Sequence, residues 1–463
     1  MMNIKLLKIN ISVLAIWFLV LFQILYVHAL AQQVVSSSTI LFPDNYGYTT
    51  IAQAGVTEVD LDGDGIMDGV LGFPTVGKGA QINDEGWVAF SSFVDLYSNG
   101  IGQVDGEGIF VGNGITTLPI AVDNRLLPAS PFSRVYRQPA INNNRIIAFK
   151  ALDAVGVSFG IHTANGLAPF DLTDMSNYTT VADITTSFNV HPANCASPAI
   201  NNNGSVAFLT IDGQSAAVVR WDPTTATSPA TFTRIVDSTL RTVAFPVSPT
   251  QFAFQESRYG GPCAPGINDA GLVTFTAPMT HPNENLTLIH RTFSPGVSIA
   301  KGPSINNSGI VALTSDVDVD GDGVMDFSAV YSGDGSTPNT MLLSSALDNI
   351  SQHLFSPDIS DFGVAAVPDF GATAPSLFPN NITLAPEKFC FISSNECAFI
   401  KITPPSPMLL RSFFRGYNNF HQFAFFGTLA GVPTPGNTNT NSPTIMRADP
   451  QAPDLKNFSI CIG

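Results

Sequence analysis

Hydrophobic and polar positions alternate in short segments, and one such segment returns along most of the chain. Each copy has a leading isoleucine, a polar stretch that ends in glycine, and an alternating run such as Val-Ala-Phe; residues 82–90 are the first clear copy. The clear copies begin at Ile82, Ile141, Ile200, Ile267, Ile305 and Ile359, and weaker copies begin at Ile51, Phe391 and Tyr417. Alternation of this kind predicts a strand with one buried face after each turn.

The polar stretch in each copy predicts a tight turn of the form Asn-x-x-Gly. Glycine at its fourth position can adopt positive φ, which such turns require. Arg145 stands at that position in the second copy, and Asn395 stands there in the weak copy that begins at Phe391. A proline lies two residues before the leading isoleucine in five copies, at Pro139, Pro198, Pro265, Pro303 and Pro357. Proline cannot lie within a central ladder, so it should mark the entry to each hairpin.

The segments between copies predict further strands. One ends in a glycine turn and occurs at residues 108–114, 160–166 and 329–335, and a shorter one occurs at 121–123, 181–183 and 235–237. The first four leading isoleucines are 59, 59 and 67 residues apart, and the later spacings are 38, 54, 32 and 26. The longer units can hold the strands of one propeller blade. We therefore predict an all-β propeller of about six to eight blades, with an open β-solenoid as the alternative.

Composition agrees with many short strands. Charged residues make up 12% of the chain and hydrophobic residues 44%, while 38 glycines and 33 prolines disfavour long helices. The formal net charge is -16, with 20 Lys and Arg against 36 Asp and Glu. Nucleic-acid binding needs clustered cations, so this balance argues against a nucleic-acid partner.

The N-terminus has the pattern of a secretory signal. Two lysines precede an apolar run at residues 11–27, and a small-x-small site ends at Ala31. We predict a signal peptide at 1–31 and one exported propeller domain at 32–463, whose C-terminal repeats are short or irregular. The protein would be secreted, held at the cell surface or periplasmic, with no membrane span after cleavage. An uncleaved anchor is the alternative.

Five cysteines lie in the predicted exported part, where disulfides can form. Cys195 and Cys263 stand at nearly the same place before the leading isoleucines of adjacent copies, so a blade-to-blade disulfide is one hypothesis. Cys390 and Cys397 flank a possible hairpin turn and are a second candidate pair. Cys461 would then remain unpaired.

Two nine-residue loops, 60–68 and 318–326, share the spacing Asp-x-Asp-Gly-Asp-Gly-x-x-Asp. Carboxylates at loop positions 1, 3, 5 and 9 and a backbone carbonyl at position 7 are ligands of the kind that Ca²⁺ takes. The predicted ligands are Asp60, Asp62, Asp64, Ile66, Asp68, Asp318, Asp320, Asp322, Val324 and Asp326. Position 12 is not Glu, which disfavours a helix-loop-helix sensor. We predict two structural Ca²⁺ sites; the alternative is an acidic turn without metal.

Other motifs give little chemistry. Residues 156–160 match G-x-S-x-G, but that motif needs a strand-to-helix turn that this strand-rich region does not predict. The histidines show no metal-binding spacing. Asp123, Asp183 and Asp237 occupy equivalent places after short strands; we favour turn closure for them over a ring of carboxylates that binds a ligand. No residue is predicted to be catalytic, and apart from Ca²⁺ no cofactor is expected.

The repeat resembles a family of secreted bacterial proteins named for N-x-x-G-x-x-x-A-F, and the Asp loops resemble the integrin-type FG-GAP loops of propellers. These resemblances imply an extracellular repeat domain in which an ion fastens a turn between two strands. We therefore favour a calcium-stabilised module that binds carbohydrate or an extracellular protein. The alternative is a secreted propeller enzyme, a polysaccharide lyase or glycosidase, which would need paired carboxylates at a shared mouth.

Overall fold

The structure is a computed structural model. It describes residues 46–76, 80–100, 102, 104–136, 138–167, 171–186, 188–191, 197–212, 215–237, 265–275, 299–317, 327–334, 340–344, 357–369, 388–393, 396–401, 408–412, 416–430 and 441–451. The chain divides into two units, Met1–Leu41 and Phe42–Gly463, and all described residues belong to the second. The predicted signal peptide therefore lies outside the described residues.

The regular structure of the described residues is almost entirely β. The strands are β1 Tyr46–Gln53, β2 Glu58–Val59, β3 Gly69–Val76, β4 Gln81–Ile82, β5 Val88–Leu96, β6 Gly106–Gly112, β7 Thr117–Val122, β8 Phe132–Val135, β9 Ala140–Ile141, β10 Ile146–Asp153, β11 Phe159–Asn165, β12 Tyr178–Ala182, β13 Ala199–Ile200, β14 Val206–Asp212, β15 Ser215–Asp222, β16 Thr231–Asp237, β17 Gly266–Ile267, β18 Val273–Thr274, β19 Ile299–Ile305, β20 Val311–Val317, β21 Phe327–Gly333, β22 Thr340–Ser344, β23 Asp358–Ile359, β24 Ala365–Asp369, β25 Lys388–Ser393, β26 Glu396–Lys401, β27 Met408–Ser412, β28 Phe423–Ala430 and β29 Asn441–Pro450. Three short 3-10 helices accompany them, η1 Tyr97–Asn99, η2 Met175–Asn177 and η3 Ile184–Thr186. None of the helices in the described part has the length and hydropathy that a membrane span requires.

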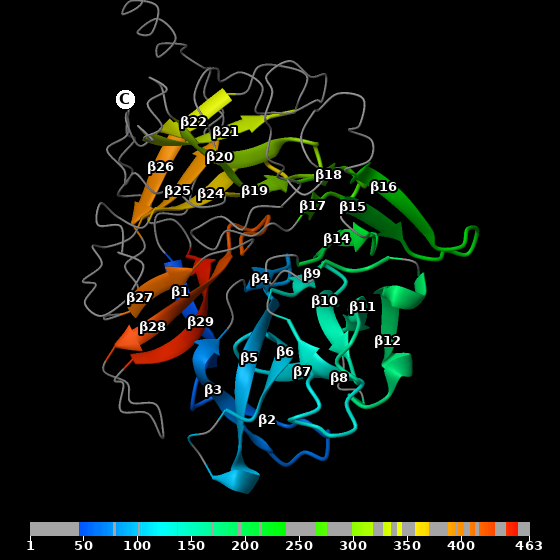
Figure 1. Cartoon of the computed structure of the whole chain (residues 1–463). Helices are drawn as coiled ribbons and strands as arrows, with labels where there is room; N and C mark the ends of the chain where they lie inside the picture. Colours follow the sequence, from blue (N-terminus) through cyan, green and yellow to red (C-terminus); the bar gives the residue numbers. More distant parts are fainter. Residues whose placement is uncertain are drawn as a thin grey trace, which may run out of the picture. The chain divides into compact units, whose positions relative to one another are not determined.

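The described strands form seven antiparallel sheets (Figure 1). In chain order they are β2-β3-β5-β6-β7, β12-β11-β10-β8, β13-β14-β15-β16, β17-β18, β19-β20-β21-β22, β23-β24-β25-β26 and β1-β29-β28-β27; β4 also pairs with β5, and β9 with β10. Each sheet contains the strand that follows one copy of the repeat. The predicted strands at 108–114, 160–166 and 329–335 are confirmed as β6, β11 and β21, which occupy the same place in their sheets.

The proline before the leading isoleucine explains a break in the sheets. In the second sheet both β8 and β9 pair with the same edge of β10, and Pro139 lies in the gap between them. At Pro303 the corresponding strand is continuous, but its register shifts between Lys301 and Ser304. Proline has no N–H to donate to a ladder, so the pairing is interrupted there.

The first strand closes the array of repeats. β1 pairs along its length with β29 near the C-terminus, from Tyr46 opposite Pro450 to Gln53 opposite Thr444, and Figure 1 shows the blue and red strands together. An open solenoid would leave its first and last repeats in separate sheets, so that alternative is wrong. The fold is an all-β propeller, and the seven sheets of the described part fall within the predicted range.

The strand assignments show that two of the weak segments, at Ile51 and Phe391, are not copies of the repeat. Ile51 lies in β1, an outer strand, and Phe391 lies in β25, the third strand of its sheet. The residue after the leading position is apolar in both segments, Ala52 and Ile392, and both lie within strands, so neither segment forms the turn described below. The weak copy at Tyr417 is confirmed, because Tyr417 bridges to Phe423 at the start of β28.

The core lies between neighbouring sheets. Val88 and Phe90 of β5 pack in one cluster with Ala424 and Ile445 of the last sheet, whereas Ala89 packs in another that includes Phe149 of the second sheet. The expectation of a single buried face is therefore wrong, because a blade is covered by a neighbour on each side. Burying one such phenylalanine contributes about 1.5–3 kcal/mol.

Candidate ligand-binding ring

Each of the seven repeat copies folds its polar stretch into the predicted turn. The N–H of the fourth residue donates to the carbonyl of the first, as from Gly86 to Asn83 at 3.0 Å. The fourth residue has positive φ in every copy: Gly86, Arg145, Gly204, Gly271, Gly309, Gly363 and His421. Arginine and histidine pay about 1–2 kcal/mol for this conformation, which glycine adopts freely.

The first residue of each turn links its copy to the next. The Asn83 side-chain amide donates to the Asn142 carbonyl at 3.2 Å, and Asn142 donates in turn to Asn201 at 2.9 Å. The series continues through Asn201 to Asn268, Asn268 to Asn306 and Asn306 to Ser360, and Asn418 donates to Asn83. These asparagines are buried. Ser360 has no amide, so its copy receives such a bond without donating one.

The second residue of each turn completes a closed circle, which we call the axial ring. Its members, in order, are Asp84, Asn143, Asn202, Asp269, Asn307, Asp361 and Asn419. The backbone N–H of each donates to the side-chain Oδ1 of the next, at 2.7–3.0 Å, and the last step returns from Asn419 to Asp84. Seven copies therefore bind one another around a common axis.

The side-chain amides of the axial ring donate to its carboxylates. Asn307 reaches Oδ2 of both Asp269 and Asp361, at 2.8 and 2.9 Å, and Asn419 similarly bridges Asp361 and Asp84. Asn143 donates to Asp84 at 2.7 Å, and Asn202 donates to Asp269 at 3.0 Å. Each carboxylate thus accepts from two amides and one backbone N–H.

A cavity of about 150 Å³ lies at this ring. It is lined by the leading isoleucines, by Tyr417 in the last copy, and by the two turn residues of every copy. No lysine, arginine or histidine is among the described residues that line it, so three carboxylates give the cavity a negative field. Drug-sized pockets are larger, about 300–1,000 Å³, so this cavity suits the end of a ligand or one small group.

The third residue of each turn is exposed beside the axial ring. These rim residues are Glu85, Asn144, Asn203, Ala270, Ser308, Phe362 and Phe420. Phe362 is 70% exposed and Phe420 is 63% exposed, and they belong to consecutive copies. Two aromatic side chains therefore stand in water next to a polar cavity.

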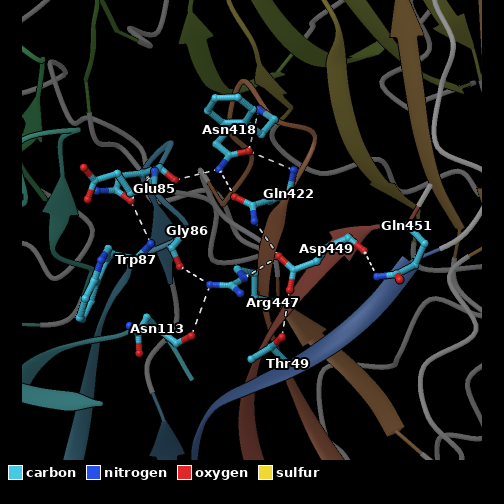
Figure 2. A network of polar contacts seen from close by, with 12 residues as sticks. Thr49, Glu85, Gly86, Trp87, Asn113, Asn418, Gln422, Arg447, Asp449 and Gln451 are labelled. Carbon is cyan, nitrogen blue, oxygen red and sulfur yellow. Dashed lines mark hydrogen bonds and ion pairs between the residues drawn. The ribbon is translucent and has the colours of Figure 1, made fainter. Parts of the chain in front are cut away.

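An arginine fastens the last sheet to the first repeat (Figure 2). Arg447 of β29 donates to the Gly86 carbonyl at 2.6 Å and pairs with Asp449 at 2.7 Å, while Gln422 donates to the same carboxylate. Arg220 repeats the arrangement between the third and fourth copies, because it pairs with Asp222 and donates to Gly271. The sequence signal was an Arg-x-Asp pair on the third strand of a sheet, and it was missed.

The first Asp loop connects β2 to β3, in the predicted strand-loop-strand setting. Carboxylate oxygens of Asp60, Asp62 and Asp68 lie within 4.8 Å of one another. Both oxygens of Asp60 accept backbone N–H groups of the loop, from Gly63 at 2.8 Å and Gly65 at 2.9 Å. Three clustered carboxylate oxygens are suitable ligands for a hard cation. Among the described residues Asp64 does not join the cluster, and its Oδ1 accepts the Ile66 N–H at 2.7 Å.

The second Asp loop, 318–326, lies outside the described residues, and so do Cys195, Cys263 and Cys461. The strands that flank this loop pair directly, with Val317 opposite Phe327. Cys390 lies opposite Phe399, and Cys397 lies opposite Ile392, so these cysteines are diagonal and not directly facing positions of one hairpin. Their pairing remains a prediction.

The remaining motifs have local roles where the structure describes them. Asp123 is buried and accepts from its own turn at Arg125, and Asp183 accepts from Thr185 in the same way, which confirms turn closure for both. The side chain of Asp237 is outside the described part. Ser158 lies in a hairpin turn between β10 and β11, where its N–H donates to Asp153, so it is not in a strand-to-helix elbow.

The fold and the axial ring define a closed β-propeller with a polar cavity on the axis of its repeats. The chain belongs to the family of unknown function DUF7453, whose model matches residues 23–288. A comparison with curated proteins gives no match.

Several solved structures are similar at low sequence identity. The polysaccharide lyase Uly1 shares 8% identity over 89% of this chain and 100% of its own, with a TM-score of 0.38. A Trypanosoma rangeli sialidase shares 9% identity over 88% of this chain and 60% of its own, with a TM-score of 0.39. A Penicillium chrysogenum alpha-L-arabinanase complexed with arabinobiose shares 10% over 87% of this chain and 98% of its own, with a TM-score of 0.33.

Proposed function

We propose that this protein is an extracellular binding module that takes the end of a carbohydrate at the axial ring. The observation that carries the proposal is the cavity itself, which seven copies of one turn line with amide and carboxylate groups. Sugars present hydroxyl groups that both donate and accept, so a ring that offers both kinds of partner suits them. The exposed Phe362 and Phe420 add apolar surface beside that ring.

The bonding of the carboxylates favours binding over catalysis. Asp361, for example, accepts the Asn307 backbone N–H at 2.8 Å and side-chain amides of both Asn307 and Asn419 at 2.9 Å. Donors of this kind occupy the oxygens of the carboxylate and hold it in one orientation. A general acid must instead gain and release a proton during the reaction.

A glycosidase is the second candidate, and one observation supports it. Asp269 and Asp361 accept from the same nitrogen of Asn307, at 2.8 and 2.9 Å. Their Oδ2 atoms are therefore less than about 6 Å apart, close to the separation of about 5–5.5 Å in retaining glycosidases.

A glycan array and turnover assays on one preparation of the full chain separate the two functions. We expect binding without product release, and we expect Asp361→Asn to weaken binding. Loss of turnover in Asp361→Asn, measured on a glycan that the wild-type protein cleaves, would instead establish the enzyme. Failure to retain any glycan would refute both. N-terminal sequencing of the secreted protein tests the extracellular assignment, and we expect its first residue to be Gln32.

We further propose that Ca²⁺ stabilises the 60–68 loop, because it would neutralise the clustered carboxylates between β2 and β3. Chelation should lower the melting temperature, and Ca²⁺ should restore it where Mg²⁺ at equal ionic strength does not. Asp62→Ala should remove that difference at the first loop, and Asp320→Ala at the second. If the melting temperature of the wild-type protein is the same with and without chelator, the proposal is contradicted.

A further inference from the structure

The axial ring cannot alternate perfectly between carboxylates and amides, because it has seven members. In an odd ring one pair of neighbours must be of the same kind. Here the ring contains three aspartates and four asparagines, and the like pair is Asn143 beside Asn202. Adjacent carboxylates would repel, whereas adjacent amides cost little. We call this junction the amide seam.

The two asparagines of the amide seam make fewer side-chain bonds within the ring than the other two asparagines. Asn307 and Asn419 each stand between two carboxylates and donate to both. Asn143 and Asn202 each have one carboxylate neighbour, and the side-chain amide of each donates to it, at 2.7 and 3.0 Å. Within the described residues, each of these two amides therefore retains one N–H that the ring does not use, at the cavity wall.

The aromatic rim lies on the other side of the ring. The seam joins the second and third copies, and Phe362 and Phe420 belong to the sixth and seventh. In a circle of seven, the sixth copy is the one opposite that junction. Exposures of 70% and 63% leave both aromatic side chains accessible. Exposed aromatic side chains thus directly follow ring residues on one side of the circle, and the unused amide donors lie on the other side.

The charge of the ring selects among sugars. Asp84, Asp269 and Asp361 face a cavity whose described lining has no basic side chain. An anionic sugar would meet like charges there without a compensating cation. An uncharged sugar meets acceptors for its hydroxyl protons at the carboxylates and donors for its own oxygens at the seam.

We infer that the axial ring recognises an uncharged sugar, which stacks at Phe362 and Phe420 while one of its oxygens accepts from Asn143 and Asn202. This inference rests on the proposed function and specifies its ligand class. The seam fixes the orientation of the sugar, and the carboxylates exclude uronic acids.

A swap of two neighbours provides the matched test. The double variant Asp84→Asn with Asn143→Asp keeps three carboxylates and four amides, and every backbone N–H in the ring keeps its Oδ1 acceptor. It moves the like pair of amides to positions 84 and 419, away from Asn202. Net charge and ring composition are unchanged, so a difference in binding reports the location of the donors.

Isothermal titration of the full chain with chitotetraose, cellotetraose and tetragalacturonate measures the selection. We expect at least one uncharged tetrasaccharide to bind the wild-type protein, and tetragalacturonate to bind at least about tenfold more weakly. The swap should weaken the uncharged sugar by about tenfold, the loss expected for one hydrogen bond to a ligand. Phe420→Leu, at an exposed position, should weaken it similarly and applies even if the swapped ring does not fold.

The outcomes separate the inference from the function on which it rests. Equal or tighter binding of tetragalacturonate refutes the selection by charge. Full affinity in the folded swap variant, or in Phe420→Leu when the swap does not fold, refutes the recognition geometry while a glycan-binding cavity stands. If the wild-type protein binds none of the three sugars and no glycan on the array, the proposed function fails as well.

Discussion

Lys150 lies buried between two sheets of the propeller, and its charge should destabilise the protein at neutral pH. The side chain is 2% exposed. Its Nζ lies 4.7 Å from the ring centre of Tyr136 and 5.6 Å from that of Phe159, and it donates to the His191 carbonyl at 3.3 Å. Burial, assisted by the nearby positive charge of Arg134, lowers the pKa of Lys150 from 10.5 to about 7.

The pKa difference gives the sign and size of the effect. A tenfold change in a protonation constant is worth about 1.4 kcal/mol, so a fall from 10.5 to about 7 corresponds to a destabilisation of about 5 kcal/mol. Between these two pH values the unfolded chain binds the proton and the folded chain does not. Stability should therefore rise with pH across that window, and the full penalty applies below pH 7.

Replacing the lysine with methionine should remove this penalty. We expect Lys150→Met to raise the free energy of unfolding at pH 7 by about 1–4 kcal/mol, because an apolar chain of similar volume replaces a buried charge and the contacts with the aromatic rings and the carbonyl are partly lost. The gain should shrink as pH rises toward 10. Urea unfolding of both proteins at matched pH values measures the difference, in which the titration of groups that do not interact with Lys150 cancels. Burial and the Lys150 charge lower the pKa of His191, so that histidine titrates below the window from pH 7 to 10.

Phe90→Leu serves as a control, since it changes a buried aromatic residue of another cluster, away from Lys150. Its effect on stability should be independent of pH in this range. A Lys150→Met protein that is less stable than wild type at pH 7, or whose gain is the same at pH 7 and pH 10, would refute the reasoning.

Three other side chains give stability predictions. Arg447→Met should lower the free energy of unfolding by about 2–3 kcal/mol and speed hydrogen exchange in β1, because the closing joint loses its charged bonds; Arg220→Met should cost a similar amount without exposing β1. Burial lowers the pKa of His162 to about 4, so acidification from pH 6.5 to 4 should destabilise the wild-type protein by about 3 kcal/mol and a His162→Phe protein less. Asn418→Ala should cost about 2–3 kcal/mol and Asn418→Ser less, since Ser360 already holds the same turn in another copy.

The turns could be predicted from the sequence because each is local. Asn83 and Gly86 are three residues apart, so their spacing alone specifies the turn and the positive φ. Arg145 and His421 show why the glycine pattern is incomplete, since both adopt the positive φ that glycine has in the other copies. Alternation was a weaker guide, because the residues on both sides of β5 are buried.

The position of the first Asp loop between two strands could be predicted from the sequence, again because its nine residues are contiguous. The axial ring could not be predicted in this way. Its bonds join positions between 38 and 335 residues apart, and no local pattern distinguishes Asp84 from any other turn aspartate. Lys150 was missed for a related reason: a lysine in an alternating segment has no signal that its neighbours will bury it.

Closure of the propeller explains which residues occupy the third position of the repeat, the position that forms the axial ring. Along the sequence, Asp, Asn, Asn, Asp, Asn, Asp and Asn read as interchangeable polar turn residues, each adequate for its own hairpin. The pairing of β1 with β29 and the bond from Asn419 to Asp84 close these seven residues into a ring. In that ring no two carboxylates are neighbours. Four asparagines are then the fewest that can keep seven positions free of adjacent aspartates, and the one amide seam is the necessary consequence. A propeller with an even number of copies could alternate throughout and would have no such seam, so the donors at Asn143 and Asn202 follow from the number of repeats as much as from their chemistry.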